Sequence, residues 1–356
     1  MNKQRFSPVT FATLLAVLLL LQACTRPQKH VPSTDEKTAF VDEVRLPATP
    51  VKQQGKSELC WIYAMLATIE TEHLVRGDSV NLSPTYLLRC LLDEQAPQLY
   101  FDRNHSPRSL RGMATMTLDL LSRHGIHPYD YYHGHEHPNT HVLARRLAQL
   151  ARASAAQRTG LKAYQDKVGQ LLDDELGFMP RYVHMLGAEY TSLEFGHSVC
   201  MDDEYEALTS FTHHPWGERF ALEVPDNQWG DKFLNVPIDT LMARIDRSLQ
   251  QGHPVCWEGD ISETGFSFAE GVADLALEVP DDDSKQHVQQ LRQQHFERLQ
   301  TTDDHCMALV GLAHDRQGRR FYLAKNSWGR HNRYGGYMYL SADYVRLKTL
   351  CIVVKR

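Results

Sequence analysis

The chain has 356 residues, of which 42% are hydrophobic and 23% are charged, a composition typical of globular proteins. This length allows one large domain or two moderate ones, with enough residues for a sizeable core. The formal net charge of -6 lacks the basic footprint of a nucleic-acid-binding protein, so we expect no nucleic acid among its partners.

The N-terminal residues predict an export signal. Two basic residues precede an apolar run from Phe11 to Leu21, and a run of about eleven residues is too short to cross a bilayer as a helix. The run ends in the stretch LQAC, which resembles the lipobox of bacterial lipoproteins, where the cysteine is acylated and becomes the new N-terminus. We therefore expect residues 1–24 to be a lipoprotein signal peptide and Cys24 to be the lipidation site. A plain secretory signal that is cleaved near Ala23 is the alternative.

A lipid on Cys24 would anchor the protein to a membrane and place it in the bacterial cell envelope, as a periplasmic or outer-membrane lipoprotein. The polar, proline-bearing residues 25–40 are expected to be a tether, followed by one structured domain over residues 41–356. The seven cysteines are widely and irregularly spaced, and no CxxC pair is present, so the sequence does not predict a structural zinc site. We expect neither a metal nor another cofactor.

The first half of the domain is predominantly helical in pattern. Residues 44–55 are expected to be an extended lead-in, and a helix is predicted from Cys60 to Gly77, with its apolar residues on one stripe. A second helix should begin after Ser83-Pro84, because proline suits a first helical turn. A third is predicted over Gly112–Gly125.

The middle of the chain is harder to assign. A loop rich in histidine and tyrosine covers residues 127–140, and a long helical stretch over residues 142–176 is expected to break into a hairpin at Gly160. Residues 178–235 give no clear pattern. An amphipathic helix is predicted over residues 239–252.

Strands dominate the last third. Runs at residues 253–262, 305–315, 319–329, 335–345 and 349–356 are expected to be strands, the second and third of them joined by a tight turn. An acidic turn at residues 281–283 should open one further helix, with Val288, Leu291, His295 and Leu299 on one face. Helices first and strands last predict an α+β fold of two lobes with a cleft between them.

Two of the predicted elements place reactive side chains next to groups that can activate them. A turn centred between Arg316 and Gln317 places His305 almost opposite Asn326, so that the amide oxygen can orient the imidazole as a catalytic base requires. Cys60 at a helix N-terminus meets unpaired N–H groups and the positive end of the helix dipole, which favour the thiolate. Gln54 can place its amide beside the same sulfur as an oxyanion donor.

The stretches QGKSELCW, DDHCMALVG and KNSWG together resemble the three blocks of papain-like cysteine peptidases. The stretches GMATMTLDLLSRHGI and HPVCWEGDIS make the bleomycin hydrolase and aminopeptidase C branch the closer match. The resemblance implies a helical N-terminal lobe, a β-rich C-terminal lobe and a helical insertion at about residues 127–235. It also implies peptides or proteins as substrates, and a homo-oligomer is compatible with it because relatives form hexamers.

The resemblance assigns roles to individual residues. Cys60 would be the nucleophile, His305 the general acid/base, Asn326 the residue that orients it, and Gln54 the oxyanion donor. Trp328 would shield the His–Asn pair from water. The substrate side of the cleft would include Gly112, which binds substrate main chain, and Arg111, which replaces the first glycine of the family's Gly-Gly pair and can restrict the cleft or pair with an acidic ligand.

Aminopeptidase activity is the first expectation from this branch. Relatives carry a C-terminal arm that enters the cleft and limits cleavage to peptide ends, and the short stretch after the last strand provides no counterpart here. Endopeptidase activity is therefore the runner-up. Because residues 56–59 replace the family's glycine-rich run, a catalytically silent, peptide-binding envelope lipoprotein is the third possibility.

Other polar groups receive plainer interpretations. A metal cluster of His305 with Asp303, Asp304 and Cys306 is disfavoured, because strand alternation points Cys306 away from the histidine. The loop histidines His213, His214, His133, His135 and His137 are expected to be solvated, with metal scavenging as the alternative. The residues Trp257, Glu258 and Asp260 are expected to end a strand near the cleft, with a role in substrate binding as the alternative.

Overall fold

The computed structural model describes residues 40–134, 139–185, 187–275 and 284–356, and Val41–Arg356 form one compact unit. Cys24, His135, His137 and the acidic turn at 281–283 lie outside the described residues. Within the described ranges, no helix combines the length and the apolar character that a membrane span requires.

The predicted helices of the first half are confirmed. They are α2 (Cys60–Val75), α3 (Pro84–Phe101), α4 (Ala114–His124), α5 (Thr140–Ala156) and α6 (Leu161–Leu176). The Ser83 hydroxyl caps α3 by accepting a hydrogen bond from the Tyr86 amide at 3.0 Å, and Pro84 occupies the first turn. Gly160 separates α5 from α6 as the break in the long helical stretch predicts.

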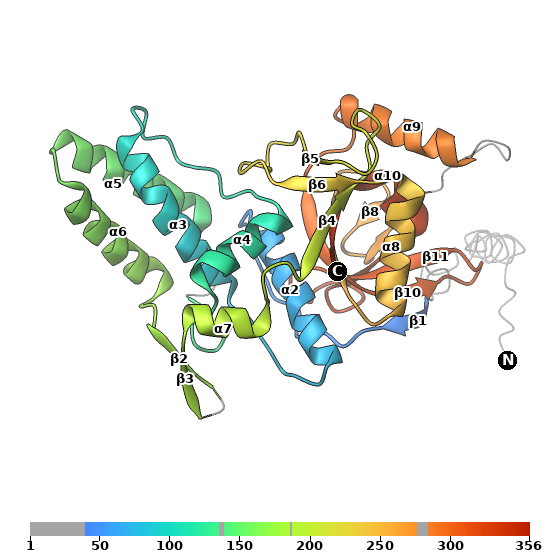
Figure 1. Ribbon diagram of the computed structural model, residues 1–356, viewed down its shortest axis with the longest axis horizontal. Coiled ribbons are helices and arrows are strands. Elements are labelled where there is room, and N and C mark those ends of the chain that lie inside the picture. Colours follow the sequence, from blue (N-terminus) through green and yellow to red (C-terminus); the bar gives the residue numbers. More distant parts are fainter. Residues whose placement is uncertain (1–39, 135–138, 186, 276–283) are drawn as a thin grey trace, which may run out of the picture. The chain divides into compact units, whose positions relative to one another are not determined.

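Helix α2 is the central helix of the unit. The sequence predicts one apolar stripe, but burial extends all round the helix from Trp61 to His73, with only Tyr63 half-exposed. Helices α3 and α4 pack against it on one side and strand β10 (His305–His314) on the other (Figure 1). A helix buried all round in this way holds its first residue in a fixed position against the sheet.

A close contact between two helices follows α4. Gly125 ends α4 with φ at 73°, and a Cβ atom at this position would lie 1.9 Å from the Ser192 carbonyl oxygen. Ser192 opens α7 (Ser192–Val199), which the short hairpin of β2 (Tyr182–Met185) and β3 (Ala188–Thr191) precedes. Glycine at residue 125 therefore supplies both the left-handed backbone and the space for α7.

A single large sheet carries the strands of the second half. Its remaining members are β1 (Val41–Arg45), β4 (Tyr205–Thr209), β5 (Arg219–Ala221), β6 (Lys232–Asn235), β7 (Val255–Gly259), β8 (Phe266–Ser267), β9 (Val272–Ala273), β11 (Arg320–Lys325), β12 (Tyr337–Ser341) and β13 (Thr349–Lys355). The order is β5-β6-β4-β13-β7-β10-β11-β12-β9-β8, and β1 pairs with the end of β10 beyond β7. The helical first part and β-rich second part confirm the predicted α+β class. Residues 205–235, which the sequence left unassigned, supply β4, β5 and β6 to this sheet.

Both faces of the central strands are buried, and strand alternation divides them. Cys256 and Cys306 face the core that α2 shares with the helical part. Val255 and Trp257 face the opposite core, which α8 (Ile238–Gln250) covers where the amphipathic helix was predicted. The start of β10 is thus packed between two cores, and it carries His305.

Two details of the second half differ from the predictions. The stretch 335–345 is strand only as far as Ser341, whose hydroxyl accepts a hydrogen bond from Tyr344 N at 3.2 Å and starts α10 (Ala342–Lys348). Helix α9 (Ser284–Glu297) ends before Leu299, which has φ at 56° and is exposed. The predicted helical face was therefore wrong at Leu299, because the chain leaves the helix before reaching it.

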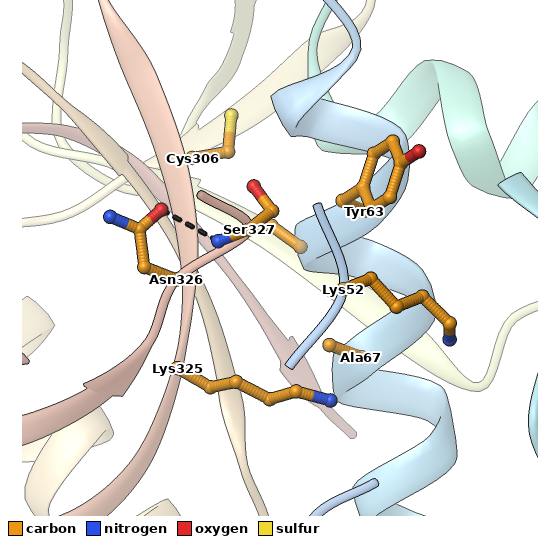
Figure 2. Close-up of a pocket in the computed structure, with 8 residues that line it drawn as sticks. Lys52, Tyr63, Ala67, Cys306, Lys325, Asn326 and Ser327 are labelled. Carbon is orange, nitrogen blue, oxygen red and sulfur yellow. Dashed lines mark hydrogen bonds between the residues drawn. The ribbon is translucent and has the colours of Figure 1, made fainter. Parts of the chain in front are cut away.

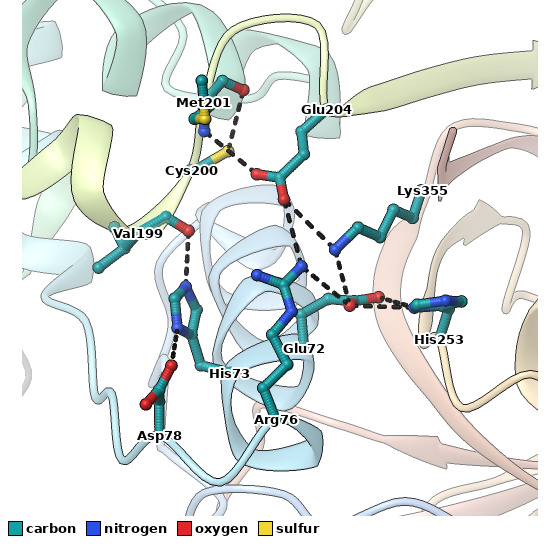
Figure 3. A network of polar contacts seen from close by, with 10 residues as sticks. All are labelled: Glu72, His73, Arg76, Asp78, Val199, Cys200, Met201, Glu204, His253 and Lys355. Atoms are coloured by element: carbon teal, nitrogen blue, oxygen red, sulfur yellow. Dashed lines mark hydrogen bonds and ion pairs between the residues drawn. The ribbon is translucent and has the colours of Figure 1, made fainter.

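Charged groups tie the C-terminal end of α2 to other elements (Figure 3). The carboxylate of Glu72 lies 3.2 Å from Lys355 Nζ of β13 and 3.0 Å from His253 Nδ1. Glu204 continues the network, at 3.3 Å from both Lys355 and Arg76. The buried helix is therefore fixed at the end opposite to Cys60.

Candidate active site

Cys60 is the first residue of α2 and is half-buried. The preceding Leu59 offers no side-chain cap, and its carbonyl accepts hydrogen bonds from the N–H groups of Ile62 and Tyr63, so it is the positive end of the helix dipole at Cys60 that favours the thiolate. A hydrogen bond from the Cys306 thiol, followed by the neighbouring His305 imidazole, holds the pKa of Cys60 well below its usual range despite burial. The site therefore favours the thiolate, the form that acts as a nucleophile.

The structure brings His305 and Asn326 together from two neighbouring strands. His305 Nε2 lies 2.8 Å from Asn326 Oδ1, and the same oxygen accepts a hydrogen bond from Ser327 N at 2.7 Å. These contacts fix the orientation of the amide and place the imidazole proton on Nε2. The other ring nitrogen, Nδ1, is then the basic one that remains for the sulfur of Cys60.

The register of the hairpin formed by β10 and β11 explains why His305 and Asn326 meet. Ala308 pairs with Lys325, the last residue of β11, and the ladder shifts between Leu309 and Gly311. Asn326 therefore begins the segment after the strand and can turn its side chain toward His305. The predicted proximity of the two residues is confirmed at the level of the contact.

Trp328 covers the imidazole. Its ring centroid lies 4.6 Å from that of His305, and the rings of Phe266 and Phe268 pack edge-on against the indole at 6.0 and 5.2 Å. This apolar cover limits the access of water to the His305–Asn326 hydrogen bond, and a hydrogen bond in such surroundings is stronger than one in water.

Gln54 lies against the same segment. Its backbone N–H donates to the Ser327 carbonyl at 2.7 Å, and its side-chain Oε1 accepts from the Ser327 hydroxyl at 2.6 Å. Nε2 donates to the Ser57 carbonyl at 2.8 Å, which uses one of its two protons. The second proton remains as the donor that an oxyanion would need, so the role of Gln54 stays a prediction.

Gly112 packs against the residue next to the nucleophile. A Cβ atom on Gly112 would lie 2.9 Å from the Trp61 ring, and Trp61 Nε1 donates to the Leu110 carbonyl at 3.0 Å. The segment 110–112 is therefore held beside the start of α2. Arg111 projects from this segment and binds Asp226, with its Nε 2.6 Å from Asp226 Oδ1.

Two further buried groups influence Cys60. Cys306 follows His305, and hydrogen bonding from Cys306 is the largest contribution that lowers the pKa of Cys60, a role that sequence reasoning missed. Glu258, the cross-strand partner of Cys306, is the penultimate residue of β7, which confirms the predicted strand end. Burial raises the pKa of Glu258 well above its usual range, and the charge of Cys60 adds to this shift.

Cys306 also lines a small pocket (Figure 2). Its lining residues include Tyr63 of α2, Lys52 of the lead-in, and Lys325, Asn326 and Ser327 at the end of β11. The pocket therefore adjoins Asn326, the hydrogen-bond partner of His305.

Below this pocket, Glu70 of α2 is fully buried and joins three segments. Its carboxylate accepts hydrogen bonds from Lys52, Thr49 and Leu82 N, and Lys325 Nζ lies 3.8 Å away. Burial raises the pKa of Glu70, but Lys52 and Lys325 outweigh this effect and leave it below its usual value. Because Lys325 precedes Asn326 directly, this ion cluster fixes the backbone that carries the orienting amide.

Among the described residues, one group of side chains has the composition of a metal site. His213 Nε2 and His214 Nε2 lie 3.1 and 2.6 Å from the two carboxylate oxygens of Glu223. Gln293 Nε2 lies 2.9 Å from His213 Nδ1, while its Oε1 accepts from Thr212 N at 2.6 Å, so His213 carries its proton on Nε2 and donates it to Glu223. Hydrogen bonds alone account for this group.

The site combines a thiol that favours its anion with an imidazole that an amide orients, an arrangement that can carry out acyl transfer. The fold is shared with the crystal structure of PepW from Lactobacillus rhamnosis HN001, with a TM-score of 0.68 and 17% sequence identity over 100% of this chain and 93% of that chain. A family model described as the Peptidase C1-like family matches residues 184–356, a range that contains His305 and Asn326.

Two curated proteins match nearly the whole chain. Aminopeptidase W of Lactobacillus delbrueckii subsp. lactis is 22% identical over 377 aligned residues, which cover 91% of this chain and 85% of that protein. Aminopeptidase G of the same organism is 22% identical over 368 residues, which cover 89% of this chain and 83% of that protein.

Proposed function

We propose that the protein is a cysteine aminopeptidase that hydrolyses peptide bonds through a thioester on Cys60. The observation that carries the proposal is the contact of 2.8 Å between His305 Nε2 and Asn326 Oδ1, and the effect of His305 on the pKa of Cys60 supports it. Two aminopeptidases that match nearly the full chain support the exopeptidase assignment.

The chemistry follows from the contacts. The Cys60 sulfur attacks the scissile carbonyl, and the negative charge that develops on the carbonyl oxygen is stabilised by the first-turn N–H groups and the free proton of Gln54 Nε2. The protonated imidazole of His305 donates its Nδ1 proton to the leaving amine as the C–N bond breaks, which leaves an acyl thioester. Water then attacks this thioester and gives up its proton to His305, which releases the carboxylic acid and returns the thiolate.

Alkylation and hydrolysis measured on the same preparation test this proposal. Iodoacetamide should modify Cys60 before Cys90, Cys200, Cys256 and Cys351, whose burial raises their pKa values. The labelled protein should lose its activity on amino-acyl fluorogenic substrates. Equal labelling of all cysteines, without hydrolysis, would favour a catalytically silent, peptide-binding protein instead.

We also propose that the protein is a lipoprotein of the bacterial cell envelope, anchored through acylated Cys24. The support is the LQAC stretch after a short apolar run. Mass spectrometry of detergent-extracted protein should find a lipid-modified peptide that begins at Cys24, and Cys24→Ala should release the protein from membranes. An unmodified N-terminus at residue 24 would contradict the anchor and leave the peptidase proposal intact.

A further inference from the structure

The contacts of Arg111 connect the two sides of the site. Arg111 belongs to the segment 110–112, which Trp61 holds beside the start of α2. Its Nη2 donates to the backbone carbonyl of Asp303, which lies two residues before His305. The side chain therefore runs from the segment beside the nucleophile to the segment that leads into the base.

A third segment closes the connection. Arg111 Nε lies 2.6 Å from Asp226 Oδ1, and Asp226 N donates to Asp303 Oδ2 at 2.8 Å. Gln228 Nε2 donates to the Arg111 carbonyl at 2.6 Å. Arg111, Asp226 and Asp303, together called the Arg111 bridge here, thus join segments that are separated along the chain by 115 residues on one side and by 77 on the other.

The bridge is built as a fixed structure. Asp226 and Asp303 are 6% and 8% exposed, and each carboxylate accepts a hydrogen bond inside the group. The hydrogen bond to Asp226 is the main reason why the pKa of Arg111 lies above its usual value, so the guanidinium stays charged. A partly buried ion pair with these additional hydrogen bonds is held more firmly than an exposed pair.

The bridge lies close to the reacting sulfur. The charge of Cys60 acts on both Arg111 and Asp226, which places the ion pair within electrostatic range of the nucleophile. The substrate main chain is expected to bind at Gly112, and Arg111 directly precedes that residue. A peptide that extends past Gly112 would therefore reach the ion pair.

We propose that the Arg111 bridge blocks the substrate path on the amino-terminal side of the scissile bond and so restricts cleavage to peptides with a short, free amino end. This inference rests on the proposed peptidase function and adds the residues that decide which peptides are cut. Burial raises the pKa of Asp226 to about 7, so above that pH the two carboxylates outnumber the one guanidinium, and the resulting negative charge complements a free α-ammonium and disfavours an acylated end.

The test compares one free and one blocked fluorogenic substrate. Wild-type protein should cleave leucyl-aminomethylcoumarin with a kcat/KM at least about a hundred times that for the acetyl-Ala-Ala-Leu derivative. Arg111→Gly and Asp226→Asn should each raise kcat/KM for the blocked substrate about tenfold or more. Arg108→Gly removes an exposed arginine that is 3.9 Å from Asp102 and should keep the wild-type ratio.

Iodoacetamide labelling of Cys60 shows whether each variant is still folded, because only a folded variant should label as the wild-type protein does. A variant that labels normally and keeps the wild-type substrate ratio overturns the inference, as does wild-type protein that cleaves both substrates equally well. If wild-type protein cleaves neither substrate and Cys60 does not label preferentially, the proposed function falls and the inference falls with it. If Arg111→Gly does not fold, the isosteric Asp226→Asn decides the question.

Discussion

The sulfur of Cys60 receives hydrogen bonds from a second thiol, that of Cys306. In a buried site, a hydrogen bond from an S–H group stabilises the thiolate. This effect adds to that of the helix dipole. Cys306 itself remains protonated because burial raises its pKa well above the usual range. In the proposed mechanism one cysteine is therefore the nucleophile and the other its hydrogen-bond donor, because their surroundings shift their pKa values in opposite directions.

Cys306→Ala should raise the pKa of the Cys60 thiol, because the substitution removes the largest contribution that lowers it. The rate of alkylation by iodoacetamide, measured against pH, should shift its midpoint to higher pH. Cys351→Ala is the matched control, since Cys351 is equally buried and contacts Glu258 rather than Cys60. An unshifted profile in Cys306→Ala would show that the helix and His305 alone set this pKa.

Asn326→Ala should reduce kcat by about a hundredfold, within the range of general acid–base effects, because the imidazole loses the acceptor that orients it. The Cys60 thiol should still be alkylated, since the thiol contacts remain. Turnover on amino-acyl fluorogenic substrates measures the loss. Wild-type kcat in this variant would mean that Ser327 and Trp328 orient His305 without the amide.

At this scale the sequence predicts contacts along one strand pair better than contacts between segments. The proximity of His305 and Asn326 follows from the length of one hairpin, so it could be predicted. The partner of Arg111 could not, because Asp226 comes from a stretch with no periodic pattern. The effect of Cys306 on Cys60 could not be predicted either, because the two residues belong to segments far apart in the chain.

At the scale of elements, the junction of α4 and α7 depends on one glycine. Gly125 carries a positive φ, and the backbone of Ser192 occupies the space that a side chain would need. Helix α4 begins directly after Gly112 and Met113, so its position affects the segment beside Cys60. A shift of α7 would therefore be transmitted to the substrate side of the site.

Gly125→Ala should lower the free energy of unfolding by about 2–4 kcal/mol, through backbone strain and overpacking together. Gly177→Ala is the matched control, because Gly177 also ends a helix with positive φ, at 89°, but a methyl group added there would meet no other atom within 4 Å. It should cost only about 1–2 kcal/mol for the backbone alone. Urea unfolding measures both values, and equal losses would show that the contact with Ser192 relaxes freely.

Secondary structure was predictable where a local signal marks an end. Ser83-Pro84, Gly125 and Gly160 each ended or opened a helix as predicted. Helix α10 was missed because the apolar residues of Ala342–Lys348 continue those of β12, and only the capping serine, Ser341, marks the change. The strands β5 and β6 are short and gain their stability from the sheet, so their sequences carry little signal.

At the scale of the whole unit, the buried carboxylate of Glu70 connects the lead-in, the central helix and the strand before Asn326. Because its pKa in the folded protein is lowered, it contributes stability that is present above the unfolded value of about 4.5 and is lost as the pH falls through the folded value. Acid should therefore loosen the site and the fold together.

Glu70→Gln should cost about 3–5 kcal/mol at pH 7, because two buried lysine charges lose their partner. The difference between wild-type and variant should begin to shrink below pH 4.5 and vanish once the pH has fallen below the lowered pKa of Glu70 in the folded protein. Urea unfolding at a series of pH values measures this trend. Glu43→Gln, which removes an exposed partner of His314 at 3.1 Å, should change stability by less than about 1 kcal/mol.

The nucleophile opens the first long helix, whereas the base and its amide partner come from β10 and the residue after β11. A ribosome therefore releases the cysteine long before it has made the histidine. A nascent chain that ends before β10 contains the thiol without the proposed base, so it cannot hydrolyse other proteins while it is being synthesised. The proposed activity can appear only after the C-terminal strands have been made and folded.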